Sequence, residues 1–377
     1  MTIPMRRREF LSTVAASSAV FALPPDGTTA SLFDGKSLAG WQVIDGPESA
    51  FYVDNGAIVI HPGSGFPSWL RTTREFENFD FTCEVFIQGW ANSGIFFCAP
   101  LHGRPTEVGF KLNLFQKQDD PPLKESIGAI FPVAAPKLVN VKSKGEWNSV
   151  RIQLDWPSLK VWMNDALVQD LDCSANPEFR YRRRSGSIGI ESLSYPLRFR
   201  NLQIKELPSK ERWTTLYNGP ADMEQWELIQ KPKYEALGEV LRGDGLGYLA
   251  TKKSYQNFEF DCYVRASYHS NGGIIFRAAS EKTEEHYEIQ LHDVEGAVYP
   301  TGSLYHYARC QPYPRIVAEQ WYPFYLRAEG KRCVVRINGD TVVDYDKLER
   351  LTPGKIMLQA HQLNKWVEYK RIRIREL

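Results

Sequence analysis

A short stretch in the second half of the chain carries three side chains suited to acid–base chemistry. In "HYEIQLHD", residues 286–293, Glu288, Gln290 and His292 alternate with three apolar residues. Because successive side chains of a β-strand point to opposite faces, the three polar groups share one face and the apolar ones face the core. A retaining glycosidase needs two carboxyl groups about 5 Å apart, and Gln290 cannot be a nucleophile. Ordinary glycoside hydrolysis by this strand is therefore not expected.

The preceding segment, "NGGIIFR" at residues 271–277, supplies the neighbouring candidates. We expect Arg277 to keep the Glu288 carboxylate ionised, and Asn271 to hold substrate hydroxyls together with Gln290. Three residues farther along the chain are further candidates for substrate binding: Asp293, Tyr305 and His361.

Each candidate also has a structural explanation. Glu288 and Arg277 could form a plain cross-strand ion pair on a solvated sheet. Asn271 precedes two glycines, where its tolerance of positive φ is reason enough for its presence. His292 and His361 could be surface histidines. A divalent metal held by Glu288 and the histidines stays an open alternative, although no ligand spacing indicates one.

The segments that must position these residues occur twice. Residues 78–100 and 257–279 are identical at ten of twenty-three positions, and further matched segments follow in the same order up to Leu377. The repeat predicts two domains, at residues 31–207 and 213–377, joined by a short polar segment.

The first copy lacks the polar residues of the second. In "GFKLNLFQK", residues 109–117, the apolar alternation persists, but other residues occupy the polar positions, and Cys98 replaces Arg277. The replacements for Glu288, Gln290 and His292 are Lys111, Asn113 and Phe115. We therefore expect the first domain to fold without catalysing.

The pattern of residues in both copies predicts β-strands. Apolar residues recur with period two, and Asn338-Gly339 is a favoured pair for a two-residue hairpin turn, with Asn164-Asp165 as its weaker counterpart. The chain contains no long amphipathic helical pattern. Many short strands with regular turns predict an all-β protein of two tandem jelly-roll β-sandwiches.

Five motifs in this order resemble the 3-keto-disaccharide hydrolase family, whose domain was long uncharacterised. They are "LFDGKSLAGW" (32–41), "NSGIFF" (92–97), "FRNLQIKEL" (199–207), "YEIQLHD" (287–293) and "TGSLY" (301–305). The resemblance covers both repeats. It implies concanavalin A-like sandwiches acting on a carbohydrate, either a glycoside or a disaccharide, whose ring is oxidised at C3.

In such a substrate the ketone acidifies the C2 proton, so one base can start elimination or hydrolysis at C1. The resemblance therefore favours Glu288, His292 and Arg277 as catalytic residues, with Arg277 also able to orient the ketone. The rival hypothesis is a non-catalytic, lectin-like protein whose aromatic side chains, Trp90, Trp69 or Tyr305, stack on sugars.

Composition and the N-terminus bear on partners and location. Lys and Arg number 46 against 45 Asp and Glu, a formal charge of +1, which disfavours nucleic acid and favours a neutral carbohydrate partner. Arg7-Arg8, followed by an apolar run up to Pro25, resembles a twin-arginine export signal. We expect residues 1–30 to direct export to the periplasm or the exterior. No later segment has the ~18 apolar residues of a membrane span.

Overall fold

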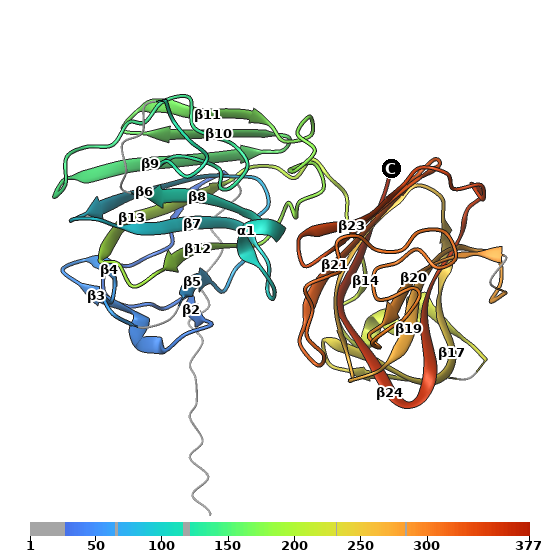
Figure 1. Ribbon diagram of the computed structural model, residues 1–377. Helices are drawn as coiled ribbons and strands as arrows, with labels where there is room; N and C mark the ends of the chain where they lie inside the picture. Colours follow the sequence, from blue (N-terminus) through green and yellow to red (C-terminus); the bar gives the residue numbers. More distant parts are fainter. Residues whose placement is uncertain (1–26, 65–66, 116–120, 231, 283–284) are drawn as a thin grey trace, which may run out of the picture.

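The structure is a computed structural model, and strands dominate it (Figure 1). The described residues are 27–64, 67–115, 121–230, 232–282 and 285–377. The predicted export signal lies outside them, except for its last four residues. Two antiparallel sandwiches follow one another along the chain, which confirms the prediction of an all-β protein with tandem jelly-roll domains.

The first domain packs an eight-stranded back sheet against a five-stranded front sheet. The back sheet has the order β11-β10-β9-β6-β13-β4-β3, with β1 beside β13, and the front sheet has the order β2-β5-β12-β7-β8. The back strands are β1 (Thr29–Ser31), β3 (Phe51–Asp54), β4 (Ala57–Ile60), β6 (Phe79–Ile87), β9 (Trp147–Asp155), β10 (Ser158–Met163), β11 (Ala166–Asp172) and β13 (Leu197–Glu206). The front strands are β2 (Trp41–Ile44), β5 (Ser68–Thr72), β7 (Asn92–Ala99), β8 (Phe110–Phe115) and β12 (Ser187–Ser192), and the short helices are η1 (Glu48–Ala50) and α1 (Pro105–Val108).

The second domain repeats this plan, but two long strands join its sheets. Its front sheet has the order β15-β17-β24-β19-β20. Residues 355–360 of β24 pair with β19 in the front sheet, whereas residues 367–376 pair with β18 in the back sheet. One continuous strand thus replaces the separate β12 and β13 of the first domain. The elements are β14 (Thr214–Tyr217), η2 (Pro220–Gln225), β15 (Trp226–Ile229), β16 (Lys233–Leu237), β17 (Val240–Tyr255), β18 (Phe258–Ala266), β19 (Asn271–Ala278), β20 (Tyr287–His292), β21 (Tyr322–Glu329), β22 (Arg332–Ile337), β23 (Asp340–Tyr345) and β24 (Gly354–Glu376).

Alternating apolar residues fill each sandwich. The first domain has one core cluster and the second has another, so each buries its own hydrophobic centre. The two predicted hairpin turns are present, since Asn338 and Gly339 have φ of 49° and 92°, and Asn164 and Asp165 have φ of 46° and 66°. All six cysteines are free and buried. Within the described residues, no helix has the length and apolar character needed to cross a bilayer.

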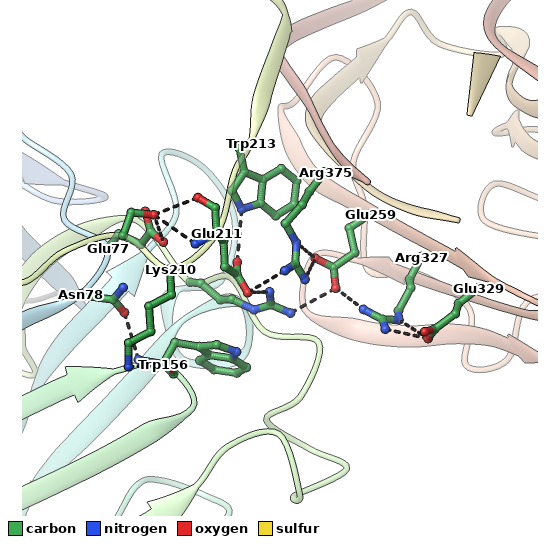
Figure 2. A network of polar contacts seen from close by, with 12 residues as sticks. Glu77, Asn78, Trp156, Lys210, Glu211, Trp213, Glu259, Arg327, Glu329 and Arg375 are labelled. Carbon is green, nitrogen blue, oxygen red and sulfur yellow. Dashed lines mark hydrogen bonds and ion pairs between the residues drawn. The ribbon is translucent and has the colours of Figure 1, made fainter. Parts of the chain in front are cut away.

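A buried network of charged residues docks the first domain against the back sheet of the second (Figure 2). Arg183 and Arg184 of the first domain lie 3.1 Å from carboxylate oxygens of Asp261 and Glu259 on β18. Glu211, in the segment between the domains, also pairs with Arg184. Because ion pairs taken out of water hold only with good geometry and full pairing, this network fixes how the domains meet.

Candidate active site

Glu288 lies on β20, at the edge of the front sheet of the second domain. Its strand neighbours Tyr287, Ile289 and Leu291 belong to the hydrophobic core, so the predicted alternation is correct. The Glu288 side chain points to the opposite face and lies across Gly273 of β19, where a Cβ atom would clash with its Oε1. Glycine at this position therefore makes room for the carboxylate.

Glu288 is buried, with only 6% of the residue exposed, and apolar side chains lie on one side of it. Along the sheet, Glu288 is opposite Ile275, which in turn is opposite Met357 of β24. Ile275 and Met357 form a small hydrophobic cluster with Ala250. Burial in these surroundings raises the pKa of Glu288 from 4.5 to about 7, since a desolvated carboxyl group resists ionisation.

Glu288 differs from the other buried acidic residues of the second domain. Glu259, Asp261 and Glu368 each contact at least two arginines. Across the described residues, Glu288 has neither a cationic partner nor a hydrogen-bond donor to its carboxylate. A buried, unpaired carboxyl group with a raised pKa marks a candidate proton-transfer site.

Amide side chains lie next to it on the same face. Gln290 is 6% exposed, and its Nε2 donates a hydrogen bond of 2.7 Å to Oδ1 of Asn271. Gly273 separates Gln290 from Gln359 of β24, which is also buried. Gln359 was not among the residues predicted from the sequence, although the period-two pattern of the last strand puts it on this face. The Gln290 carbonyl oxygen and the Gln359 amide are suited to bind sugar hydroxyls.

Two histidines lie at the open end of this row. His292 is opposite Asn271, and His361 is on the neighbouring strand β24. Partial burial and the nearby His361 lower the pKa of His292, against the opposing effect of Asp293. His292 is therefore a neutral imidazole at neutral pH, able to donate one hydrogen bond and accept another.

Tyr305 belongs to a segment that runs alongside β20. Its backbone N–H donates to the Glu288 carbonyl oxygen at 2.9 Å, and Gln290 N–H donates to the Ser303 carbonyl oxygen at 2.9 Å. The Tyr305 ring contacts Tyr299 and His306, with centroid distances of 5.3 and 4.0 Å. An aromatic cluster thus lies on the segment that runs next to β20.

The structure contradicts the role predicted for Arg277. Its guanidinium donates to the carbonyl oxygens of Gln256, Gly330 and Arg350 and to Oδ1 of Asn257. Its positive φ of 49° turns the side chain away from the alternation that the sequence predicted. Arg277 therefore ties loops together instead of ionising Glu288, whose pKa shift comes from burial alone.

The corresponding face of the first domain carries a different pair. Lys111, in the place of Glu288, lies 2.5 Å from Glu191, which occupies the position of Gln359 on β12. The Lys111 amine also lies 5.1 Å from the Phe131 ring. Lys111 was predicted to replace Glu288, but its partner Glu191 was not predicted. The Glu191 carboxylate is paired with a lysine, whereas Glu288 has no cationic partner, so this face does not reproduce the second site.

Within the described residues, no three His, Cys, Asp or Glu side chains gather closely enough to hold a metal ion. The second site instead combines one buried carboxyl group, three amides, a neutral imidazole and nearby tyrosines. This arrangement can take a proton from carbon and stabilise an oxyanion with hydrogen bonds. Two-carboxylate glycoside hydrolysis is not supported, because Glu288 is the one buried carboxylate that the described front-sheet strands bring to this face.

Comparisons with known proteins identify the domain type. The sequence profile of the 3-keto-alpha-glucoside-1,2-lyase-like domain matches residues 28–205 and again residues 212–375. No functionally curated protein matches the chain.

Several solved structures are similar to one domain of this chain. A proposed glycosyl hydrolase from Parabacteroides distasonis is 20% identical over 48% of this chain and 94% of its own, with a TM-score of 0.42. The carbohydrate-binding module CBM66 from Bacillus subtilis is 14% identical over 43% of this chain and all of its own, with a TM-score of 0.31. The Bacillus licheniformis β-glucanase is 12% identical over 45% and all of its own, with a TM-score of 0.31. Similarities this low do not indicate what the chain binds or cleaves.

Proposed function

Because the chain belongs to the 3-keto-alpha-glucoside-1,2-lyase-like family, in two tandem copies, we propose that its second domain cleaves 3-keto glycosides or disaccharides. The chain is thus a carbohydrate-related protein, and the substrate and the mechanism are the proposal. A single buried, unpaired carboxyl group, Glu288, carries this proposal.

The ketone at C3 lets one base perform the reaction. Glu288 takes the proton from C2, and the electron pair moves to the C3 oxygen as an enolate. When the enolate collapses, a C1–C2 double bond forms, the C1–O bond breaks and the departing oxygen takes a proton. Protonated Glu288 can return that proton, and addition of water across the double bond would complete a net hydrolysis.

The neighbouring groups suit the remaining roles. Neutral His292 is suited to donate a hydrogen bond to the enolate oxygen, as a lowered pKa favours the uncharged imidazole. Gln290, Asn271 and Gln359 would hold ring hydroxyls, and Tyr305 or Asp293 would border the leaving group. Arg277 has no part in this scheme, because carbonyl oxygens already occupy its guanidinium.

Glycan binding is a second candidate function, and one observation in the first domain favours it. Trp90 is 57% exposed and packs edge-on against Phe115 and Tyr195, at centroid distances of 5.5 and 5.1 Å. Its open ring is suited to stack on a sugar. The first domain would then hold carbohydrate while the second reacts with it.

We also propose that the twin-arginine segment exports the protein to the periplasm or beyond. Replacing Arg7 and Arg8 with Lys should leave the protein inside the cell, as measured by fractionation and immunoblotting. Export at the normal rate would remove this proposal without affecting the catalytic one.

The catalytic proposal is tested with purified protein and 3-keto disaccharides of several linkages, with chromatography to follow product release. Glu288→Gln should abolish release. The matched control is Glu191→Gln, the same substitution on the corresponding face of the first domain, which should retain activity. Binding of these sugars without release, by the wild type, would favour the glycan-binding function instead.

A further inference from the structure

A cavity of about 440 Å³ lies between the two domains, on the side of the second domain away from Glu288. Trp156 and Tyr181 of the first domain contribute to its wall, as do Glu211 of the connecting segment and Arg332 of strand β22. Pockets for small ligands typically measure about 300–1,000 Å³. This cavity can therefore hold a molecule the size of a monosaccharide.

Arginines dominate the charged lining of the cavity. Five guanidinium groups line it: Arg180, Arg184, Arg327, Arg332 and Arg375. Four of these have carboxylate partners, which Figure 2 shows in part. The pairs are Arg184 with Glu211 and Glu259, Arg327 with Glu259 and Glu329, Arg375 with Glu259 and Glu211, and Arg332 with Asp344. Four of the five arginines are thus paired with these four carboxylates.

Arg180 is the fifth guanidinium. Its Nε is buried without a hydrogen-bond acceptor, and in the described part of the chain no carboxylate pairs with its side chain. Its guanidinium carbon lies over the Tyr181 ring, 5.8 Å from the centroid. Arg332, across the cavity, uses Nε and Nη2 for Asp344 and leaves Nη1 free of that pair. Donors from both domains therefore remain for a ligand.

The cavity also contains acceptors. Glu211 and Glu329 line it, and the Glu329 side chain is 55% exposed. Carboxylates repel a bare anion but accept hydrogen bonds from hydroxyl groups. Guanidinium groups bind carboxylate and sulfate oxygens in pairs. The lining thus matches a ligand that carries both an oxyanion and hydroxyl groups.

We propose that this interdomain cavity binds an acidic sugar, one bearing a carboxylate or sulfate group and no larger than about a monosaccharide. Arg180 and Arg332 contact the oxyanion, and Glu211 and Glu329 accept from its hydroxyls. Because Arg180 belongs to the first domain and Arg332 to the second, the ligand bridges the domains. The site is separate from the proposed catalytic face and does not depend on it.

The test is calorimetric titration of the mature protein, at fixed ionic strength, with four probes: glucuronate, glucose 6-sulfate, glucose and sodium sulfate. We expect the two acidic sugars to bind at least tenfold more tightly than glucose or inorganic sulfate. Arg180→Gln should weaken their binding at least tenfold. The matched control is Arg198→Gln, since Arg198 pairs with Asp54 on the surface of the same domain, and it should bind as the wild type does.

Several outcomes would overturn the proposal. Failure of both acidic sugars to bind would overturn it, and so would an Arg180→Gln variant that binds them as tightly as the wild type. If inorganic sulfate bound as tightly as glucose 6-sulfate, the cavity would bind anions without recognising the sugar, which would also overturn the proposal. If Arg180→Gln fails to fold, Arg332→Lys replaces it: this variant keeps the charge but not the planar fork, so unchanged affinity there would also overturn the proposal.

Discussion

Replacing Glu288 with Gln allows the contribution of this carboxyl group to catalysis and its effect on stability to be measured separately. Burial raises its pKa from 4.5 to about 7. Between these two pH values the folded protein keeps a proton that the unfolded chain has released, so the free energy of unfolding falls as pH rises through this window. At about 1.4 kcal/mol per pKa unit, the loss amounts to about 3 kcal/mol by pH 8.

Glu288→Gln has no carboxylate to desolvate. We therefore expect urea unfolding to give the variant a gain of about 3 kcal/mol over the wild type at pH 8, and almost no gain at pH 4.5. Turnover of a 3-keto glycoside should fall by about 10²- to 10⁴-fold, the usual cost of losing a general base. In the wild type, kcat/KM should rise with pH and level off above about pH 7.

Glu191→Gln provides the control, because Glu191 pairs with Lys111. Its replacement removes that ion pair and should produce no gain at pH 8. If Glu288→Gln changed the unfolding free energy equally at both pH values, the burial argument would be refuted. Wild-type turnover by the variant would show that another residue is the base.

Three further predictions concern the surroundings of the site and the domain interface. Gly273→Ala should reduce turnover at least tenfold while the circular dichroism spectrum stays native, because its Cβ displaces Glu288; a fully active variant would contradict this. Arg277→Gln should lower the unfolding free energy by roughly 3 kcal/mol, since a buried guanidinium that donates several hydrogen bonds is lost, yet leave kcat of the folded fraction unchanged. Burial raises the pKa of Glu259, but Arg184 and two other arginines outweigh burial and lower this pKa to about 2. The stability that ionised Glu259 contributes should therefore disappear as pH falls from about 4.5 to 2. Acid unfolding curves should show a smaller loss of stability over this range for Arg184→Ala.

The sequence alone predicted the sheets and the face of the site, because period-two alternation determines which side chains share a face. Glu288, Gln290 and His292 lie together as expected, with Asn271 beside them. The lowered pKa of His292 was not predictable, because it comes first from burial and then from His361, and both depend on how distant parts of the chain pack.

Arg277 was assigned wrongly because alternation assumes a regular strand. Its backbone has φ of 49°, and the corresponding Cys98 of the first domain has φ of 49° as well. The strand is irregular at this point in both copies, so strict alternation no longer predicts the face to which the side chain points. Likewise, Glu191 was overlooked because its partner Lys111 lies eighty residues away on another strand, and no local pattern links them.

The docking of the two domains also limits how many copies can be joined. Arg183 and Arg184 of one copy bind Asp261 and Glu259 of the next, which is a head-to-tail contact between related units, and such contacts can extend into open filaments. The positions that correspond to these arginines in the second copy are Leu351 and Thr352.

The matching surface of the first copy also lacks the acidic residues free to accept this contact. Asp80 corresponds to Glu259, and it is already bonded to Arg151 and Gln153 of its own domain. Thr82 stands where the second copy has Asp261. Neither end of the molecule therefore carries the residues that would repeat this contact, so this mode of head-to-tail docking is used once, between the two domains.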